Sequence, residues 1–149
     1  MTLYNFVESF KNIALKQPSV HSAFDGSVYD NLNGNPHSRY CVFNLSQTTH
    51  REEENFDIYG ANLFMIDRQD STLKNNILQV QSISKELLSN IIKTFCEKYD
   101  AEALTIIYHP FVEKFVDLCC GMYATVEIEV PKDSTCEEDY WYGRIKKRN

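Results

Sequence analysis

The spacing of apolar residues divides this chain into elements, beginning with a helix at the N-terminus. Apolar side chains in residues 3–16, LYNFVESFKNIALK, recur three and four positions apart, at Leu3, Phe6, Val7, Phe10, Ile13 and Ala14. That spacing places them on one stripe of an amphipathic helix. Thr2 is the expected N-cap, and Pro18 is expected to end the helix.

Residues 17–38, QPSVHSAFDGSVYDNLNGNPHS, have no clear period and are rich in Pro, Gly, Asn, Asp and Ser. This composition predicts a loop. The segment is longer than most connections inside a domain, which favours a functional loop or an interface loop.

Two alternating stretches follow, joined by a charged segment. Residues 39–49, RYCVFNLSQTT, and residues 56–67, FDIYGANLFMID, each alternate between two faces, whereas residues 50–55, HREEEN, contain no apolar side chain. The pattern predicts a β-hairpin with an exposed tip at 50–55. Both faces of the second strand are fairly apolar, so we expect cover on both sides for part of its length. Gly60 predicts a bulge or a close backbone approach.

A second helix is predicted from Ser84 onward, but the sequence does not settle where it begins. Residues 68–82, RQDSTLKNNILQVQS, are compatible with a loop that holds a short extended piece or with the first turns of a helix. From Ser84 the period is helical, with Leu87, Leu88, Ile91, Ile92 and Phe95 on one side. With Ser84 as N-cap, Ile83 and Leu88 would form a hydrophobic staple.

Two more strands are predicted after this helix. Residues 102–109 alternate and are expected to end at Pro110, and residues 111–121, FVEKFVDLCCG, are expected to form a short linker or helical turn. Residues 121–130 alternate strictly before Pro131. Their core-facing side chains are Met122, Ala124, Val126, Ile128 and Val130, and their outward side chains are Tyr123, Thr125, Glu127 and Glu129.

The order α-β-β-α-β-β predicts an α+β fold: an antiparallel four-stranded sheet with helices packed on one face. We assign residues 1–131 to this single domain. Residues 132–149, KDSTCEEDYWYGRIKKRN, turn from acidic to aromatic to basic without a period and are interpreted as an extended C-terminal arm.

Composition narrows the classes of function. The chain has 149 residues, 43% hydrophobic and 24% charged, which is ordinary for one globular domain. Its formal charge of −6 lacks the basic footprint of most nucleic-acid binders, although acidity is compatible with a protein that surrounds DNA and repels it. No apolar run is long enough to span a membrane, and the N-terminus does not resemble a secretory signal.

The five cysteines do not form a recognisable redox or metal pattern. They stand at positions 41, 96, 119, 120 and 136 without a C-x-x-C, and the four histidines lack zinc-site spacing. We interpret the cysteines as small apolar side chains in a reducing cytosol. The weaker alternative is that Cys119 or Cys120 is a nucleophile with His109 as its base. We therefore predict no metal, no cofactor and no catalytic residue.

The arm and the hairpin tip are the candidate interface. Tyr140, Trp141 and Tyr142 are costly to leave in water, and together with Arg144 they belong to the residue types enriched in binding hot spots. The other predicted interface residues, at the exposed tip, are Glu52, Glu53 and Glu54. The alternative for the arm is that it folds back onto its own sheet.

Three stretches carry a family resemblance: YGANLFMIDR at 59–68, ILQVQSISKELLSNIIKTF at 77–95 and PFVEKFVDLCCGMYATVEIEVP at 110–131. Together they resemble small neck and tail-completion proteins of tailed phages, of the kind found in crAss-like and related phages of Bacteroidales. The likeness covers roughly residues 56–131, and FDGSVYDNL at 24–32 matches more loosely. The pattern C-x-G-x-Y-A falls on Cys119, Gly121, Tyr123 and Ala124, as packing and turn residues.

The resemblance implies a structural virion protein that forms a ring as a head-to-tail connector or tail terminator. It implies homo-oligomerisation, contact with adjacent neck or tail proteins, and non-specific proximity to genomic DNA in the lumen, without a membrane or a small-molecule substrate. The protein would be made in the bacterial host cytoplasm and reside in the virion. The alternatives are a monomeric adaptor that binds a peptide or small molecule and, less favoured, a small cysteine-dependent enzyme.

Overall fold

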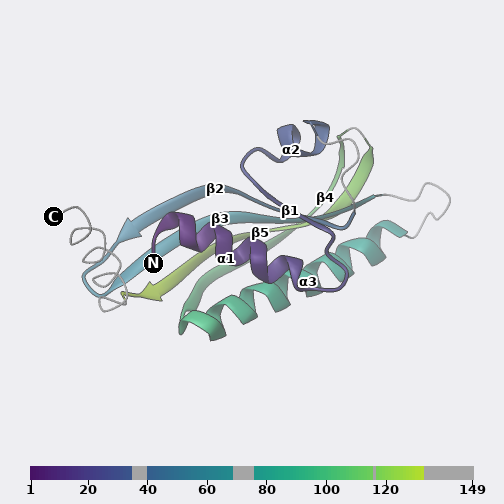
Figure 1. Ribbon diagram of the computed structural model, residues 1–149. Helices are drawn as coiled ribbons and strands as arrows, with labels where there is room; N and C mark the ends of the chain where they lie inside the picture. The colour runs from purple at the N-terminus through teal and green to yellow at the C-terminus, as the bar shows by residue number, and fades with distance from the viewer. Residues whose placement is uncertain (35–39, 69–75, 116, 133–149) are drawn as a thin grey trace.

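A five-stranded mixed sheet with helices on both faces forms the fold (Figure 1). The computed structural model describes residues 1–34, 40–68, 76–115 and 117–132. Its elements are α1 (Leu3–Leu15), β1 (Ser22–Asp25), α2 (Val28–Gly34), β2 (Val42–Glu52), β3 (Phe56–Arg68), α3 (Asn76–Tyr99), β4 (Glu102–Lys114) and β5 (Leu118–Pro131). The strand order is β1-β2-β3-β5-β4, and every neighbouring pair is antiparallel except β1 and β2. The predicted α+β class is confirmed.

The prediction of four antiparallel strands with helices on one face was wrong in two respects, and both arise in the segment predicted as a loop. Ser22–Asp25 forms β1, which pairs in parallel with β2 and adds a fifth strand. Val28–Gly34 forms α2, on the opposite side of the sheet from α1 and α3 (Figure 1). A strand of four residues is too short to show a period, and its place is fixed by backbone pairing with β2.

Helix α1 forms as its apolar stripe predicts. The Thr2 side chain accepts a hydrogen bond from the Asn5 backbone N–H at 3.1 Å, which confirms the predicted N-cap. Phe6, Phe10 and Ile13 are buried against the sheet and α3. The helix therefore contributes one side of the main core.

Helix α3 begins at Asn76, so the N-cap predicted at Ser84 was wrong. Ser84 is only 2% exposed, because it belongs to the helix's buried face with Gln81 and Leu88. Of the two alternatives for residues 68–82, the helix is confirmed for residues 76–82, and residues 69–75 lie outside the described residues. Ile83 is exposed and forms no staple.

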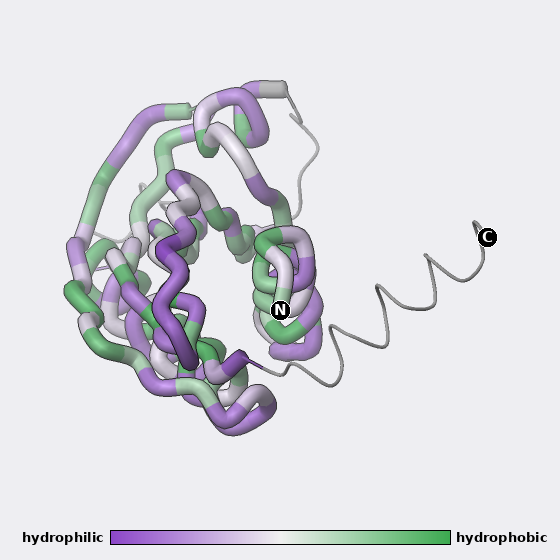
Figure 2. The backbone as a smooth tube through the Cα atoms, turned by 90° about the vertical axis from the view of Figure 1, so that its left-hand side faces the viewer, coloured by the Kyte–Doolittle hydropathy of each residue, from purple (hydrophilic) through white to green (hydrophobic). Residues whose placement is uncertain are grey.

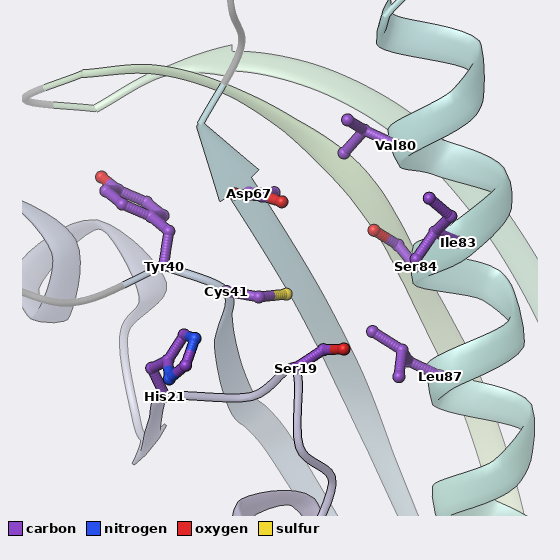
Figure 3. A pocket seen from close by; sticks show the side chains of 9 residues that line it. All are labelled: Ser19, His21, Tyr40, Cys41, Asp67, Val80, Ile83, Ser84 and Leu87. Carbon is purple, nitrogen blue, oxygen red and sulfur yellow. The ribbon is translucent and has the colours of Figure 1, made fainter.

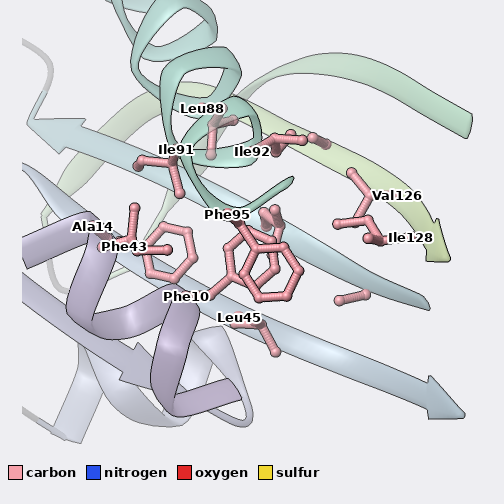
Figure 4. Packing of buried hydrophobic residues seen from close by; sticks show 14 of the residues in the cluster. Phe10, Ala14, Phe43, Leu45, Leu88, Ile91, Ile92, Phe95, Val126 and Ile128 are labelled. Atoms are coloured by element: carbon pink, nitrogen blue, oxygen red, sulfur yellow. The ribbon is translucent and has the colours of Figure 1, made fainter. Parts of the chain in front are cut away.

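Aromatic rings join the two long helices to the sheet. Phe6 stacks on Tyr59 with ring centroids 4.6 Å apart, and Phe10 stacks on Phe95 at 4.2 Å. Phe43, Leu45, Val126 and Ile128 come from the sheet into the same core (Figure 4). Seen nearly down the axis of α1, the sheet curves around the helical layer, with hydrophobic and hydrophilic residues alternating along it (Figure 2).

A second, smaller core lies on the opposite face of the sheet. Val28 and Leu32 of α2 pack there with Val42, Ile66 and Cys119 of the strands. Because Met65 packs in the main core and Ile66 in the smaller one, this confirms that β3 is covered on both sides for part of its length. Val42 and Phe43 show that the same holds for β2. The buried Asn44 amide holds the β1–α2 connection against β2, since it donates to the Gly26 carbonyl at 3.1 Å.

The β2–β3 hairpin is confirmed, with a bulge in β2 between Ser46 and Thr49. The predicted tip at 50–55 was too long, because β2 continues through Glu52, which pairs with Asp57. Gly60 lies opposite Thr49, and a Cβ atom at Gly60 would stand 2.4 Å from the Thr49 hydroxyl oxygen. A close approach is therefore present at this glycine, but it is made by the Thr49 side chain, whereas the nearest backbone atom, the Val126 carbonyl oxygen, lies at an ordinary contact distance.

Strand β4 runs through Pro110 to Lys114, so the predicted end at Pro110 was wrong. The prediction of a linker or helical turn over 111–121 was wrong as well, because β5 already begins at Leu118. Pro110 is tolerated because β4 is the last strand of the sheet, where one row of backbone groups has no ladder partner. The facing predicted for β5 is confirmed: Ala124, Val126 and Ile128 are buried in the main core, whereas Thr125 and Glu127 are exposed.

Candidate assembly surface

The hairpin tip is exposed as predicted and is tied to the end of β5. Glu52, Glu53 and Glu54 are all exposed. The Lys132 ammonium donates to the Glu52 carboxylate at 2.7 Å and thereby lowers the pKa of Glu52 below its ordinary value. The Lys132 backbone N–H donates to the Asn55 carbonyl at 3.0 Å. The end of β5 is therefore held beside the tip.

The other predicted interface residues are Tyr140, Trp141, Tyr142 and Arg144. All four lie outside the described residues. Of the predicted interface, Glu52, Glu53 and Glu54 are thus placed by the structure, and their position beside Lys132 relates the tip to the start of the arm.

Strand β4 is an edge with unusual character. None of its 13 residues is buried. Leu104, Ile107 and Val112 are 45%, 50% and 49% exposed, and Ile106 is also exposed. Edge strands in natural proteins are usually short, charged or covered, because their free backbone groups pair readily with another strand. A long apolar edge of this kind is a surface suited to a partner.

The open face is a second exposed surface, on the side of the sheet away from α1 and α3. Its residues share one face through cross-strand pairing; they are Asn62, Phe64, Glu102, Thr105, Ile107, His109, Tyr123, Thr125, Glu127 and Glu129. The Thr125 hydroxyl donates to the Asn62 side-chain oxygen at 2.9 Å across it. Of the described helices, only α2 packs on this side, in the smaller core with Ile66 and Cys119, and Phe64 at one end of the open face is packed against that core.

The open face has an aromatic half and an acidic half. In the aromatic half, Tyr123 stacks on Phe64 at 4.9 Å between centroids and on His109 at 4.6 Å. In the acidic half, Glu102 lies directly opposite Glu129 on the neighbouring strand, and Glu127 is two positions along β5. Like charges directly opposite each other destabilise a sheet, so this arrangement favours a cationic partner.

The alternative of a cysteine-dependent enzyme depends on the thiols of Cys41, Cys119 and Cys120. These lie at the end of the sheet away from the acidic half. Cys41 lines a pocket of about 330 Å³ between the α1–β1 connection, the residues just before β2, the end of β3 and α3, and its side chain points toward α3 (Figure 3). The remaining lining residues are Ser19, His21, Tyr40, Asp67, Val80, Ile83, Ser84 and Leu87. Burial, assisted by the Asp67 carboxylate, raises the pKa of Cys41 to about 12. A nucleophilic cysteine requires a lowered pKa, so this thiol is poorly suited to attack.

Cys119 and Cys120 are buried, and burial raises the pKa of both thiols. The Cys119 thiol donates to the Tyr40 hydroxyl at 3.6 Å, and the Tyr40 hydroxyl donates to the Asp117 carboxylate at 3.2 Å. His109 lies opposite Tyr123, four residues along β5 from Cys119, which is about 13 Å at strand spacing. The structure therefore does not bring the hypothetical base to the thiol.

The described part of the chain holds neither a cluster of metal ligands nor a membrane-spanning helix. Within 1–34, 40–68, 76–115 and 117–132, no three His, Cys, Asp or Glu side chains group as metal ligands. No helix in this described part is long and apolar enough to cross a membrane.

Sequence reasoning missed β4 as a surface and missed the pairing of Glu102 with Glu129. The run LTII at 104–107 was the available signal for the β4 surface. Three of its four residues are large and apolar, which places apolar side chains on both faces of the strand. The second needed the register of β4 on β5, which includes a shift between Ala103 and Thr105.

Comparison with models of known protein families gives no match for this chain, and comparison with curated protein sequences gives none either.

Proposed function

We propose that this protein is a structural subunit that forms a ring in the neck of a tailed phage, as a head-to-tail connector or tail terminator, with DNA passing through the lumen. The observation that carries the proposal is β4, a 13-residue edge strand without a single buried residue. A neighbouring subunit against this edge would cover its apolar side chains and pair its free backbone groups.

The two edges of the sheet favour a head-to-tail contact. Strand β1, at the other edge, has four residues and cannot cover the 13 of β4 by edge-to-edge pairing. A subunit that uses β4 against a different surface of its neighbour repeats in one direction, and such a contact closes into a ring when the rotation permits.

The charge of the chain fits passage of DNA. A formal charge of −6 per subunit gives a ring a negative field, which discourages DNA from adhering to the lumen. The resemblance to neck and tail-completion proteins supplies the biological setting of this proposal: the protein resides in the virion after synthesis in the host cytoplasm, beside other neck or tail proteins.

Light scattering and negative-stain electron microscopy of the purified protein test the proposal. We expect closed rings with a central opening. The double variant Leu104→Lys/Ile107→Lys should give monomers. The matched control Leu15→Lys/Leu78→Lys changes two other exposed leucines, 48% and 73% exposed, and should leave the rings intact. A chain that stays monomeric and does not join phage particles, or that forms only symmetric dimers, would refute the proposal.

A second candidate function is a monomeric adaptor that binds a peptide or small molecule, and the Cys41 pocket favours it. Its volume of about 330 Å³ lies at the small end of ligand sites. Filling the pocket with Ser84→Leu would abolish ligand binding without touching β4. The raised pKa of the described thiols weighs against the third alternative, a cysteine-dependent enzyme.

A further inference from the structure

We propose that the open face of each subunit binds the C-terminal segment, residues 133–149, of a neighbouring copy. The inference rests on the proposed self-assembly and names one of its contacts. It starts from two properties of the open face: apolar rings at one end and unneutralised carboxylates at the other.

The acidic half has a described cation on the same face, Arg51, which lies two strands from Glu129 and pairs with Glu53 instead. In the ranges that the structure describes, no ion pair involves Glu102, Glu127 or Glu129. Glu102 and Glu129 nevertheless stand directly opposite each other, and Glu127 lies on the same face two residues away. A cationic segment bound here would relieve their repulsion.

The C-terminal segment has the complementary chemistry in the complementary order. Its last ten residues read YWYGRIKKRN, aromatic and then basic. In an extended chain, Tyr142, Lys146 and Arg148 share one side because side chains alternate with a period of two. Lys146 and Arg148 stand four and six positions after Tyr142.

The open face repeats the same spacing along β5. Glu127 and Glu129 likewise stand four and six positions after Tyr123, and all three share one face. A segment that runs in the direction of β5 therefore places Tyr142 at the aromatic half, Lys146 at Glu127 and Arg148 at Glu129. Aromatic contact and ion pairs then form together.

The position at which the C-terminal segment begins assigns it to a neighbouring copy. The segment begins after Lys132, at the acidic end of the open face. To run along its own β5 in the same direction, it would first have to retrace the strand from Pro131 to Tyr123, about 26 Å. The nine residues 133–141 span about 30 Å when fully extended, so they would cover that distance only as a nearly straight chain, with almost no length left for the two reversals of direction that the path requires. That path would also carry Glu137, Glu138 and Asp139 past the acidic half, where like charges repel.

Photo-crosslinking on the full-length chain tests the inference. Tyr142 is replaced by p-benzoylphenylalanine, and equal amounts of ¹⁵N-labelled and unlabelled protein are mixed while dilute, concentrated and irradiated. We expect mass spectrometry to find crosslinks near Tyr123 or Phe64, with half of them joining a labelled to an unlabelled chain. Crosslinks within one chain only, or to other surfaces, would overturn the inference.

A reciprocal charge exchange gives an independent readout. Glu127→Lys/Glu129→Lys and Lys146→Glu/Arg148→Glu should each weaken self-association about tenfold, and mixing the two proteins should restore it, because the acidic segment of one meets the basic face of the other. The matched control Glu53→Lys/Glu54→Lys should have no such effect. Restoration only when all four changes share one chain would mean that the segment binds its own domain, and no weakening in either variant would also overturn the inference.

The two proposals fail separately. Rings that persist in the charge variants, with no crosslink to the open face, would leave the assembly proposal standing and remove this one. Crosslinks between chains in a sample without rings would remove the ring and leave the contact.

Discussion

Gly121 of β5 lies against the main chain of Met65 in β3 so closely that a Cβ atom at Gly121 would stand 2.0 Å from the Met65 carbonyl oxygen. Gly121 pairs with Ile66 in the ladder, next to the buried Cys119 and Cys120. The glycine therefore allows β3 and β5 to approach at the point where both faces of the sheet are covered.

Gly121→Ala should destabilise the domain by about 2–3 kcal/mol, because the new methyl group meets backbone that cannot yield without parting the strands. Urea unfolding followed by circular dichroism measures the change. Thr125→Ala, on the same strand and exposed, is the control and should shift stability by less than about 1 kcal/mol. Equal stability of the two variants would contradict the observed register.

Val126→Asp should unfold the domain. Val126 is 1% exposed in the core between α3 and the sheet, and a carboxylate there would be buried without a partner. Thr125→Asp puts the same group on the opposite, exposed face and should leave the domain folded. Thermal melts of both proteins decide the matter, and an unchanged melting temperature for Val126→Asp would show that the facing of β5 is wrong.

The stability of the folded chain should fall as the pH rises from 8 to 10. Burial raises the pKa of Cys41 to about 12 from an ordinary value of 9.0, so above pH 9 the unfolded state releases a proton that the folded state keeps. At pH 10 this difference removes about 1.4 kcal/mol of stability. The buried thiols of Cys119 and Cys120 have raised pKa values and act in the same direction.

Urea unfolding under reducing conditions at several pH values measures this loss. The variant Cys41→Ala should show a shallower decline than the natural chain, by about the same 1.4 kcal/mol at pH 10. Parallel curves for the two proteins would mean that the Cys41 thiol ionises as readily in the folded chain as in the unfolded chain.

Removal of residues 133–149 should leave the domain folded and weaken assembly. Lys132 is retained in this truncation because it bonds to Glu52 and Asn55 at the hairpin tip. Circular dichroism should give an unchanged melting temperature, while light scattering should show smaller particles at the same concentration. A truncated chain that assembles normally would show that the segment is not part of the contact.

Local pattern was a reliable guide where an element is amphipathic. The apolar stripe of α1, the alternation of the β2–β3 hairpin and the facing of Val126 were all predicted correctly, because each element buries one set of side chains and exposes another. Glu127 and Glu129 were also placed outward correctly. Ser84 was misassigned because a small polar residue on a buried helix face resembles an N-cap in sequence.

The sequence by itself determined the α+β class, the amphipathic elements and the acidic tip, since these depend on the order of side chains within a few residues. Only the tertiary structure decided that Ser22–Asp25 joins the sheet beside β2, that β4 continues through Pro110 as the edge, and that Glu102 stands opposite Glu129. Those three features depend on which strands become neighbours. Strand neighbours are chosen by backbone pairing and by packing between residues far apart in the chain, and no local period records that choice.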